Sequence, residues 1–371
     1  MAFAILSKET RFNFVKFCKF AYLISAFFIL LGIAAIAWNG GLRFGVDFAG
    51  GVMVQVKFDR PIDDEQVKQA LDGVDLPGLT IQEVGMGGDS YLLRFASKNT
   101  GEIQKLRSQV MDALKSRIPD NAAVIERLES VGSKVGNDLR NMAVEALFYA
   151  VLMMTVYISG RFEHSWFVAG GMSAVLFLAV YAVGYFGFSQ LWGVAIGMVV
   201  TLICCWKLKL NFALGAILAL CHDVMVVTGL ITLLGVEIDL NTIAALLTII
   251  GYSINDTIVE YDRIRENLRA IPADASPKPT MGEIINRSVN QTLARTIMTS
   301  VTTFVACLAL YILGGSVIHD FALTMTLGII FGTWSSIFIA SPILLKFGDI
   351  GLYHRKAQVA VREEIGEHGV V

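Results

Sequence analysis

The sequence has 371 residues, of which 55% are hydrophobic and 17% are charged, and its mean hydropathy is +0.61. A chain of this composition is too apolar for one soluble core, so we expect repeated spans that cross a hydrocarbon layer of roughly 30 Å. The formal net charge of −2 says little about partners; we expect a lipid bilayer and no nucleic acid. The five cysteines lie in or beside apolar segments and lack CxxC spacing, so no disulfide framework, metal or cofactor is expected.

The N-terminal segment combines basic residues with an apolar run at 20–38. A positive segment followed by a long apolar run places the N-terminus in the cytoplasm. Residues 1–38 are therefore assigned as a cytoplasmic end and the first membrane helix. A signal peptide cleaved after 35–37 is the alternative, which the length of the run disfavours.

Residues 39–137 are of mixed polarity and are numerous enough for one compact domain. Alternating hydrophobic residues predict strands at 52–58, 79–84, 91–95 and 123–128. Helical spacing is found at 63–72 and 103–118, and a glycine-rich turn is expected at 85–88. The resulting order βαββαβ is that of a ferredoxin-like split βαβ unit.

Residues 138–346 are nearly all membrane-like and predict a helical bundle. The expected spans lie at about 141–159, 165–187, 191–206, 211–235, 239–260, 293–313 and 319–345. When the spans alternate in direction, one side receives the basic markers, which are Arg161, Lys207, Lys209, the 263–287 loop and the tail 347–371. This positive-inside pattern predicts eight membrane helices, cytoplasmic termini and a large domain on the opposite side.

Ionisable residues inside the spans each need a reason, because one near the bilayer centre costs roughly 2.5–3.5 kcal/mol. Those that stand out are Asp223, Asp256, Glu260 and Arg295. Asp256 and Arg295 are seven and eight residues from the basic ends of the same predicted loop. They should therefore lie at similar depth on adjacent helices, where a carboxylate and a guanidinium can form bidentate hydrogen bonds.

Further polar residues at helical spacing extend from this pair. Thr299 shares a helix face with the arginine, and Asn255 lies beside the aspartate. His222 and Asp223 add two titratable groups on the preceding span, and such a line is suited to carrying protons. The alternatives are a buried structural salt bridge with threonines that pack helices, and packing near an interface for the histidine–aspartate pair. Glu260 is nearer the boundary and is expected to snorkel to water.

A glycine-rich segment follows the first span. Gly45, Gly50 and Gly51 permit positive φ or close backbone approach where the chain leaves the membrane. Asp47 is placed to cap the turn or to accept backbone N–H groups, and a plain loop is the alternative.

Several segments together resemble signatures of the SecD/SecF family, in its SecF form. They are GVDFAGG at 45–51, SVGSKVG at 130–136, GYSINDTIV at 251–259, DRIREN at 262–267, NQTLARTIMTS at 290–300 and LGG at 313–315. The resemblance covers residues 1–163 and 211–350.

The resemblance implies a polytopic α-helical bundle of the resistance-nodulation-division (RND) type with an α+β, ferredoxin-like periplasmic domain, in the bacterial inner membrane. It implies a subunit, not an enzyme, that acts with SecD and uses the proton-motive force to help unfolded exported polypeptides through the SecYEG channel. Asp256 and Arg295 match the family's proton-coupling residues. Two rivals stay open: a passive subunit that braces the channel, and half of a small-molecule or lipid exporter. Sodium could also replace protons.

The sequence departs from the family pattern in two places. Residues 164–210 read as an inserted hairpin of two spans, and an even number of crossings preserves the placement of everything downstream. With this insertion, the sequence alone does not decide whether the family's usual packing of six helices is kept. Glu260 stands where the family generally has an apolar residue.

Overall fold

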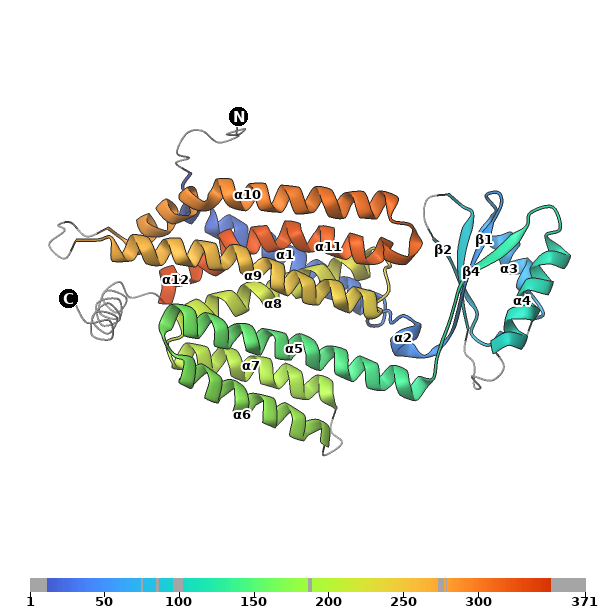
Figure 1. Ribbon diagram of the computed structural model, residues 1–371, viewed down its shortest axis with the longest axis horizontal. Helices are drawn as coiled ribbons and strands as arrows, with labels where there is room; N and C mark the ends of the chain where they lie inside the picture. Colours follow the sequence, from blue (N-terminus) through green and yellow to red (C-terminus); the bar gives the residue numbers. More distant parts are fainter. Residues whose placement is uncertain are drawn as a thin grey trace, which may run out of the picture.

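The computed structural model describes residues 12–74, 76–84, 87–95, 103–185, 189–272, 277 and 279–347. It is elongated, with a helical bundle at one end and a small α+β domain at the other (Figure 1). Among the described residues, eight helices are long and apolar enough to cross a membrane, which confirms the predicted fold class. The expected turn at 85–88 lies partly, and the tail 347–371 almost wholly, outside the described residues.

The membrane helices include all the predicted spans. In chain order they are α1 (Phe14–Trp38), α5 (Ser133–Glu163), α6 (Trp166–Tyr185), α7 (Gln190–Lys207), α8 (Asn211–Leu233), α9 (Leu240–Arg269), α10 (Met281–Leu313) and α11 (Ser316–Ser335). The last continues through a π-helical turn, η2 (Ser336–Ala340), into α12 (Ser341–Phe347). The hydropathy pattern predicts the start of α10 about three turns too late along the chain. The reason is that the first turns of this helix are polar and are held by a Thr280–Glu283 capping box.

The domain is a four-stranded antiparallel sheet in the order β2-β3-β1-β4, covered by two helices. Its elements are β1 (Gly51–Phe58), α3 (Asp64–Leu71), β2 (Thr80–Glu83), β3 (Ser90–Phe95), α4 (Ile103–Arg117) and β4 (Ala123–Val131), preceded by a short helix, α2 (Val46–Ala49). This is the predicted βαββαβ order. Val52, Val54 and Val56 belong to the apolar core between sheet and helices. Met53 and Gln55 point to the opposite face, as strand alternation requires.

That opposite face of the sheet lies over the end of the bundle (Figure 1). A cavity of about 360 Å³ lies between them, lined from the sheet by Gln55 and Arg94 and from the bundle by Glu237 and Asp320. Arg94 and Glu237 form a largely buried ion pair across it. Burial lowers the pKa of Arg94 to about 10, so the guanidinium stays charged at neutral pH.

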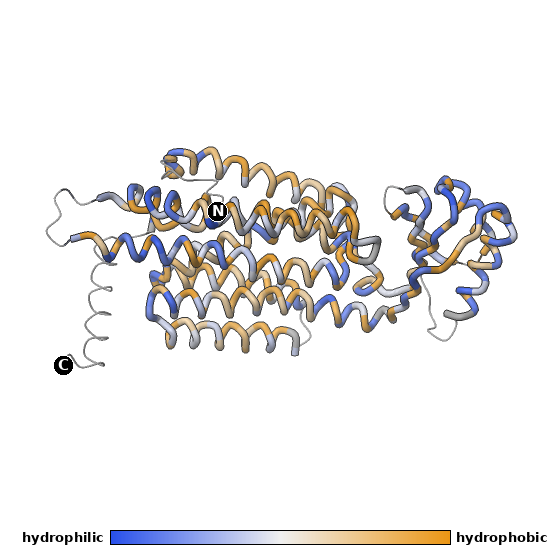
Figure 2. The backbone as a smooth tube through the Cα atoms, turned by 45° about the horizontal axis from the view of Figure 1, so that its top comes forward, coloured by the Kyte–Doolittle hydropathy of each residue, from blue (hydrophilic) through white to orange (hydrophobic). Residues whose placement is uncertain are grey.

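The bundle is apolar along most of its length, whereas polar residues gather on the domain and at the far end of the helices (Figure 2). Its centre is α8, the most enclosed of the eight described spans. α1 crosses α8 at Gly32 and Gly229, where a Cβ atom added to Gly32 would lie 2.8 Å from the Cα of Gly229. Such close crossings are typical of small residues in membrane helices, where packing rather than the hydrophobic effect holds helices together.

The predicted hairpin forms α6 and α7, which pack on one another and on α5. The backbone N–H of Phe212, at the start of α8, donates to Oε1 of Glu163, at the end of α5, at 3.0 Å. The chain therefore leaves the bundle to form the hairpin and returns to the bundle at the same place.

Candidate functional site

Asp256 is buried near the middle of α9, between α10 and α11. The residue is 4% exposed, and Ser300 of α10 donates to its carboxylate at 3.4 Å. The hydroxyl of Ser300 in turn lies 2.7 Å from that of Thr333 on α11. Thr299, one of the predicted residues, is also close enough to interact with the carboxylate. A carboxyl group with so few hydrogen bonds in an apolar bundle is costly to keep charged, so it is suited to binding and releasing a proton.

Arg295 does not form the expected bidentate pair with Asp256. The arginine is exposed, and no salt bridge joins the two among the described residues, although the charges still interact. The reason is rotation about the axis of α10. Thr296 and Ser300 belong to the buried face of this helix, and Arg295 precedes Thr296 by one residue, about 100° around the helix. Asn255 of α9, expected in a relay, is exposed as well.

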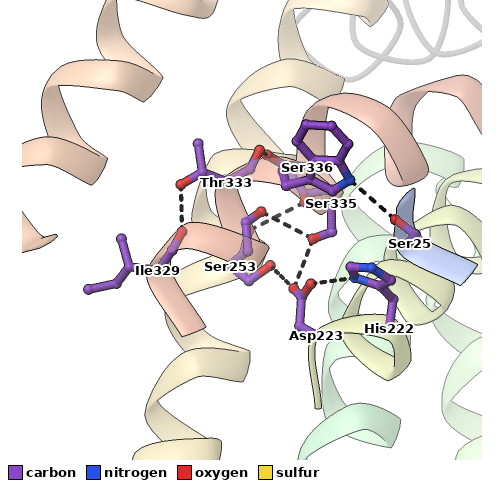
Figure 3. A network of polar contacts seen from close by, with 11 residues as sticks. Ser25, His222, Asp223, Ser253, Ile329, Thr333, Ser335 and Ser336 are labelled. Carbon is purple, nitrogen blue, oxygen red and sulfur yellow. Dashed lines mark hydrogen bonds and ion pairs between the residues drawn. The ribbon is translucent and has the colours of Figure 1, made fainter. Parts of the chain in front are cut away.

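His222 and Asp223 form a second buried polar cluster between α8, α9 and α11 (Figure 3). Nδ1 of His222 lies 2.9 Å from Oδ1 of Asp223. Oδ2 of the aspartate accepts hydrogen bonds from Ser253 at 2.6 Å and from Ser335 at 2.9 Å. The pair lies at the middle of α8, not at its end. Nε2 of His222 has no hydrogen-bond partner within the described residues.

The two clusters are neighbours on α9, because Ser253 and Asp256 are one turn apart. No hydrogen bond between described side chains joins Asp256 to Asp223. Groups of three or more His, Cys, Asp or Glu side chains placed to hold a metal ion do not occur in the part of the chain that the structure describes.

Glu260 does not snorkel to water, so that expectation was wrong. The residue is 1% exposed, and Ser341 donates to its Oε2 at 2.6 Å. The π-helical turn η2 precedes Ser341 and presents this hydroxyl to the carboxyl group. The sequence places Glu260 near the boundary, but the α11–α12 segment covers it.

The glycine motif ties the first linker to the loop between α8 and α9. The N–H of Gly45 donates to the carbonyl of Ile238 at 2.9 Å, and the N–H of Leu240 donates to Asp47 at 3.0 Å. Asp47 therefore binds the N-terminus of α9, where a carboxylate is favoured, and not its own turn. Gly50 and Gly51 have φ values of 75° and 124°, as expected for glycine.

Family models match this chain in two regions. The model described as "Protein export membrane protein SecD/SecF, C-terminal" matches residues 110–192 and 188–349, more than half of the chain. The SecD/SecF GG motif matches residues 38–62, which include the glycine motif. The chain belongs to the SecD/SecF family.

Relatives named protein translocase subunit SecF match nearly the whole chain. That of Calditerrivibrio nitroreducens is 34% identical over 340 residues, covering 92% of this chain and 95% of the relative. That of Desulfurispirillum indicum is 37% identical over 340 residues, covering 90% and 92%. The crystal structure of SecDF from Thermus thermophilus, described as a translocon-associated membrane protein, matches with a TM-score of 0.65 at 30% identity. That match covers 91% of this chain but only 38% of the longer SecDF chain.

In this member of the SecD/SecF family, sequence reasoning missed the hydroxyl groups that contact the buried carboxyls. They are Ser253, Ser300, Ser335 and Ser341. Helical spacing could have indicated Ser253, which precedes Asp256 by one turn on the same helix. All four, Ser253 included, contact a carboxyl on a different helix, so only the tertiary packing reveals which carboxyl each hydroxyl meets.

Proposed function

We propose that this chain is a SecF-type subunit that works with a SecD-type partner at the SecYEG channel. It uses the proton-motive force to help move unfolded exported polypeptides, and it acts as a transport component without catalysing a reaction. The names of its relatives support this role. In this proposal the chain lies in the bacterial inner membrane. The basic ends of α5, α7 and α9 face the cytoplasm, and the α+β domain faces the periplasm.

The observation that carries the proposal is a polar face on α9 and α10 beside a buried acid. Asn255, Arg295 and Thr302 are exposed on these two packed helices, well inside the apolar spans. An arginine facing lipid at this depth costs roughly 2.5–3.5 kcal/mol. A second bundle that presents hydrogen-bond acceptors would remove this cost. The SecDF chain of T. thermophilus is long enough to include such a bundle, since this chain matches 38% of it.

The proposed mechanism is a change in charge that alters helix packing. A proton that binds Asp256 neutralises the carboxylate that attracts Arg295, so the two protonation states favour different positions of α9 and α10. The membrane potential supplies about 2.3 kcal/mol per charge per 100 mV. The N-terminus of α9 is bound to Asp47 in the linker to the domain, so a movement of α9 would reach the domain.

The test is export of a secreted reporter in cells that depend on this protein. We expect Asp256→Asn and Arg295→Met to reduce export strongly while membrane levels and co-purification with SecD stay unchanged. Asp262→Asn is the matched control. It makes the same chemical change on the same helix, but its carboxylate is exposed and pairs with Arg161.

Normal export in Asp256→Asn cells would contradict proton coupling and would favour a passive subunit that braces the channel. Normal protein export combined with loss of small-molecule or lipid efflux would favour the exporter alternative.

A further inference from the structure

Glu260 is a buried acid that forms no ion pair among the described residues. The residue is 1% exposed, Oε2 accepts a hydrogen bond from Ser341, and Oε1 has no hydrogen-bond partner among the described residues. Within the described residues no cationic side chain forms an ion pair with it, and the charged group that acts on it is Asp256. A permanent charge in this position would be strongly unfavourable, so the group must be able to bind a proton.

The backbone around Glu260 is irregular. In the π-helical turn η2 the N–H of Ser341 donates to the carbonyl of Ser336, five residues earlier. The hydroxyl of Tyr261 donates to the carbonyl of Ala340 at 3.1 Å. Adjacent residues of α9 therefore contact the same turn, one through a carboxyl group and one through a phenol. Single π-helical turns inside α-helices are frequent at functional sites.

Glu260 lies one turn beyond Asp256, on the side away from the domain. Residues four apart on a helix have Cβ atoms about 5–6 Å apart, a gap that side-chain rotation or one water molecule can bridge. Two residues further on, Asp262 is exposed and pairs with Arg161 at the bundle end. Side chains of α9 therefore change from buried to solvent-accessible within two residues of Glu260.

We infer that Glu260 is a second proton-binding residue, which receives the proton from Asp256 and passes it to the cytoplasmic end of α9. This inference rests on the proposed function. In the transfer, protonated Asp256 gives its proton to Oε1 of Glu260 and becomes a carboxylate again. Glu260 then releases the proton to water at the bundle end. Ser341 stays hydrogen-bonded to Oε2 throughout and holds the carboxyl in place. Each cycle moves one proton, and both carboxylates are restored.

A purely structural role makes the opposite prediction about variants. If Glu260 served only to accept the hydrogen bond of Ser341, glutamine would replace it well, because its carbonyl oxygen is also an acceptor. Loss of the hydroxyl in Ser341→Ala would then be the more harmful change. For a proton carrier the order is reversed, since glutamine cannot bind a proton at this position.

The experiment measures proton flux in liposomes that contain the full chain with its SecD-type partner and a trapped pH-sensitive dye. Wild type is compared with Asp256→Asn, Glu260→Gln, Glu260→Asp and Ser341→Ala at several external pH values. We expect Glu260→Gln to lower the flux by about 100-fold or more, the range for loss of a positioned proton-transfer group. Glu260→Asp should keep the flux with a shifted pH profile, and Ser341→Ala should lower it only a few-fold. Melting temperatures report folding.

Wild-type flux in Glu260→Gln, together with loss in Asp256→Asn, would overturn the inference and leave the proposed function intact. A Ser341→Ala variant that loses more flux than Glu260→Gln, and has the lower melting temperature of the two, would also overturn it in favour of a structural hydrogen bond. Wild-type flux in Asp256→Asn would instead overturn the proposed function, and the inference would fall with it.

Discussion

The carboxylate of Asp223 collects hydrogen bonds from three side chains inside the bundle. These come from His222 on its own helix, from Ser253 on α9 and from Ser335 on α11. Because the aspartate is 1% exposed, water cannot replace a lost partner. The cluster therefore joins three helices at their centre and adds stability as long as every donor is satisfied.

We predict that Asp223→Asn destabilises the folded bundle by about 1–3 kcal/mol, the penalty for leaving a buried polar group without its partner. In wild type a serine hydroxyl donates to a carboxylate oxygen of Asp223. In the variant the amide nitrogen of asparagine would replace one of these oxygens, so two donors would face each other. Thermal unfolding in detergent measures the effect. Ser335→Ala, which removes one donor, should lower stability by about 1 kcal/mol. Unchanged stability in Asp223→Asn would contradict a packing role and would leave proton handling as the reason for the cluster.

Single residues show clearly where sequence reasoning succeeds and where it ends. Asp256 could be predicted, since an acid in an apolar span is itself a signal. The pairing with Arg295 could not, because distance from the loop fixes the height of a residue along the helix but not its rotation about the axis. The sequence predicts that Glu260 reaches water, because the π-helical turn that covers it, η2, gives no recognisable pattern of hydropathy. The contacts of Asp223 with two other helices likewise depend on the packing.

Among the helices, α1 and α8 make a close contact that is formed by one glycine from each. A Cβ atom at Gly229 would lie 2.5 Å from the Cα of Gly32, closer than real side-chain contacts come. The two helices therefore cross backbone to backbone. α1 continues into the linker that carries the glycine motif, so its position along α8 also positions that linker.

We predict that Gly32→Leu pushes α1 away from α8 and lowers the melting temperature in detergent markedly, because a bulky side chain in a close-packed contact costs about 1–3 kcal/mol or more. The matched control is Gly170→Leu on α6. A Cβ atom at Gly170 meets nothing within 4 Å, so the same substitution should be nearly neutral there. Equal melting temperatures for the two variants would show that α1 is free to move along α8.

Element order was easier to predict than element ends. The strands of the domain begin at or within one residue of their predicted starts, since alternation of buried and exposed positions is a strong local signal. The helix α2 was missed because four residues are too few for a periodic pattern. α5 begins at Ser133, inside the stretch assigned to the domain, and α9 continues past its predicted end to Arg269. A helix can continue beyond the membrane into water, whereas an apolar stretch of sequence ends at the membrane boundary.

In the molecule as a whole, the arrangement of the two parts depends on the contact that holds the domain against the bundle. Sheet and bundle meet across the cavity that Arg94 and Glu237 bridge. Asp239 and Asp320 also act on the charge of Arg94, so one guanidinium faces several acids. This arrangement was invisible in the sequence, because its members lie far apart in the chain and follow no period. In the proposed function, this contact is one that domain movement would have to break.

We predict that Arg94→Ala loosens the domain more than Glu237→Ala does. Without Arg94, three carboxylates lose the cation that they share, whereas without Glu237 the arginine keeps two acids nearby. Hydrogen exchange of the loop 234–239 reports the change, since the Ile238 N–H donates to the carbonyl of Arg43 in this structure. We expect Arg94→Ala to speed exchange by at least about 10-fold, equivalent to about 1.4 kcal/mol.

The matched control is Arg127→Ala, because Arg127 lines the same cavity but pairs with Glu129 on its own strand. Its loss removes the same charge without breaking a contact between domain and bundle, so exchange in the loop should stay near that of wild type. Exchanging the two charges, with Arg94→Glu and Glu237→Arg together, should restore protection if the ion pair itself holds the domain. Equal exchange in Arg94→Ala and Arg127→Ala would mean that the linkers and the Asp47–Leu240 bond hold the domain without the ion pair.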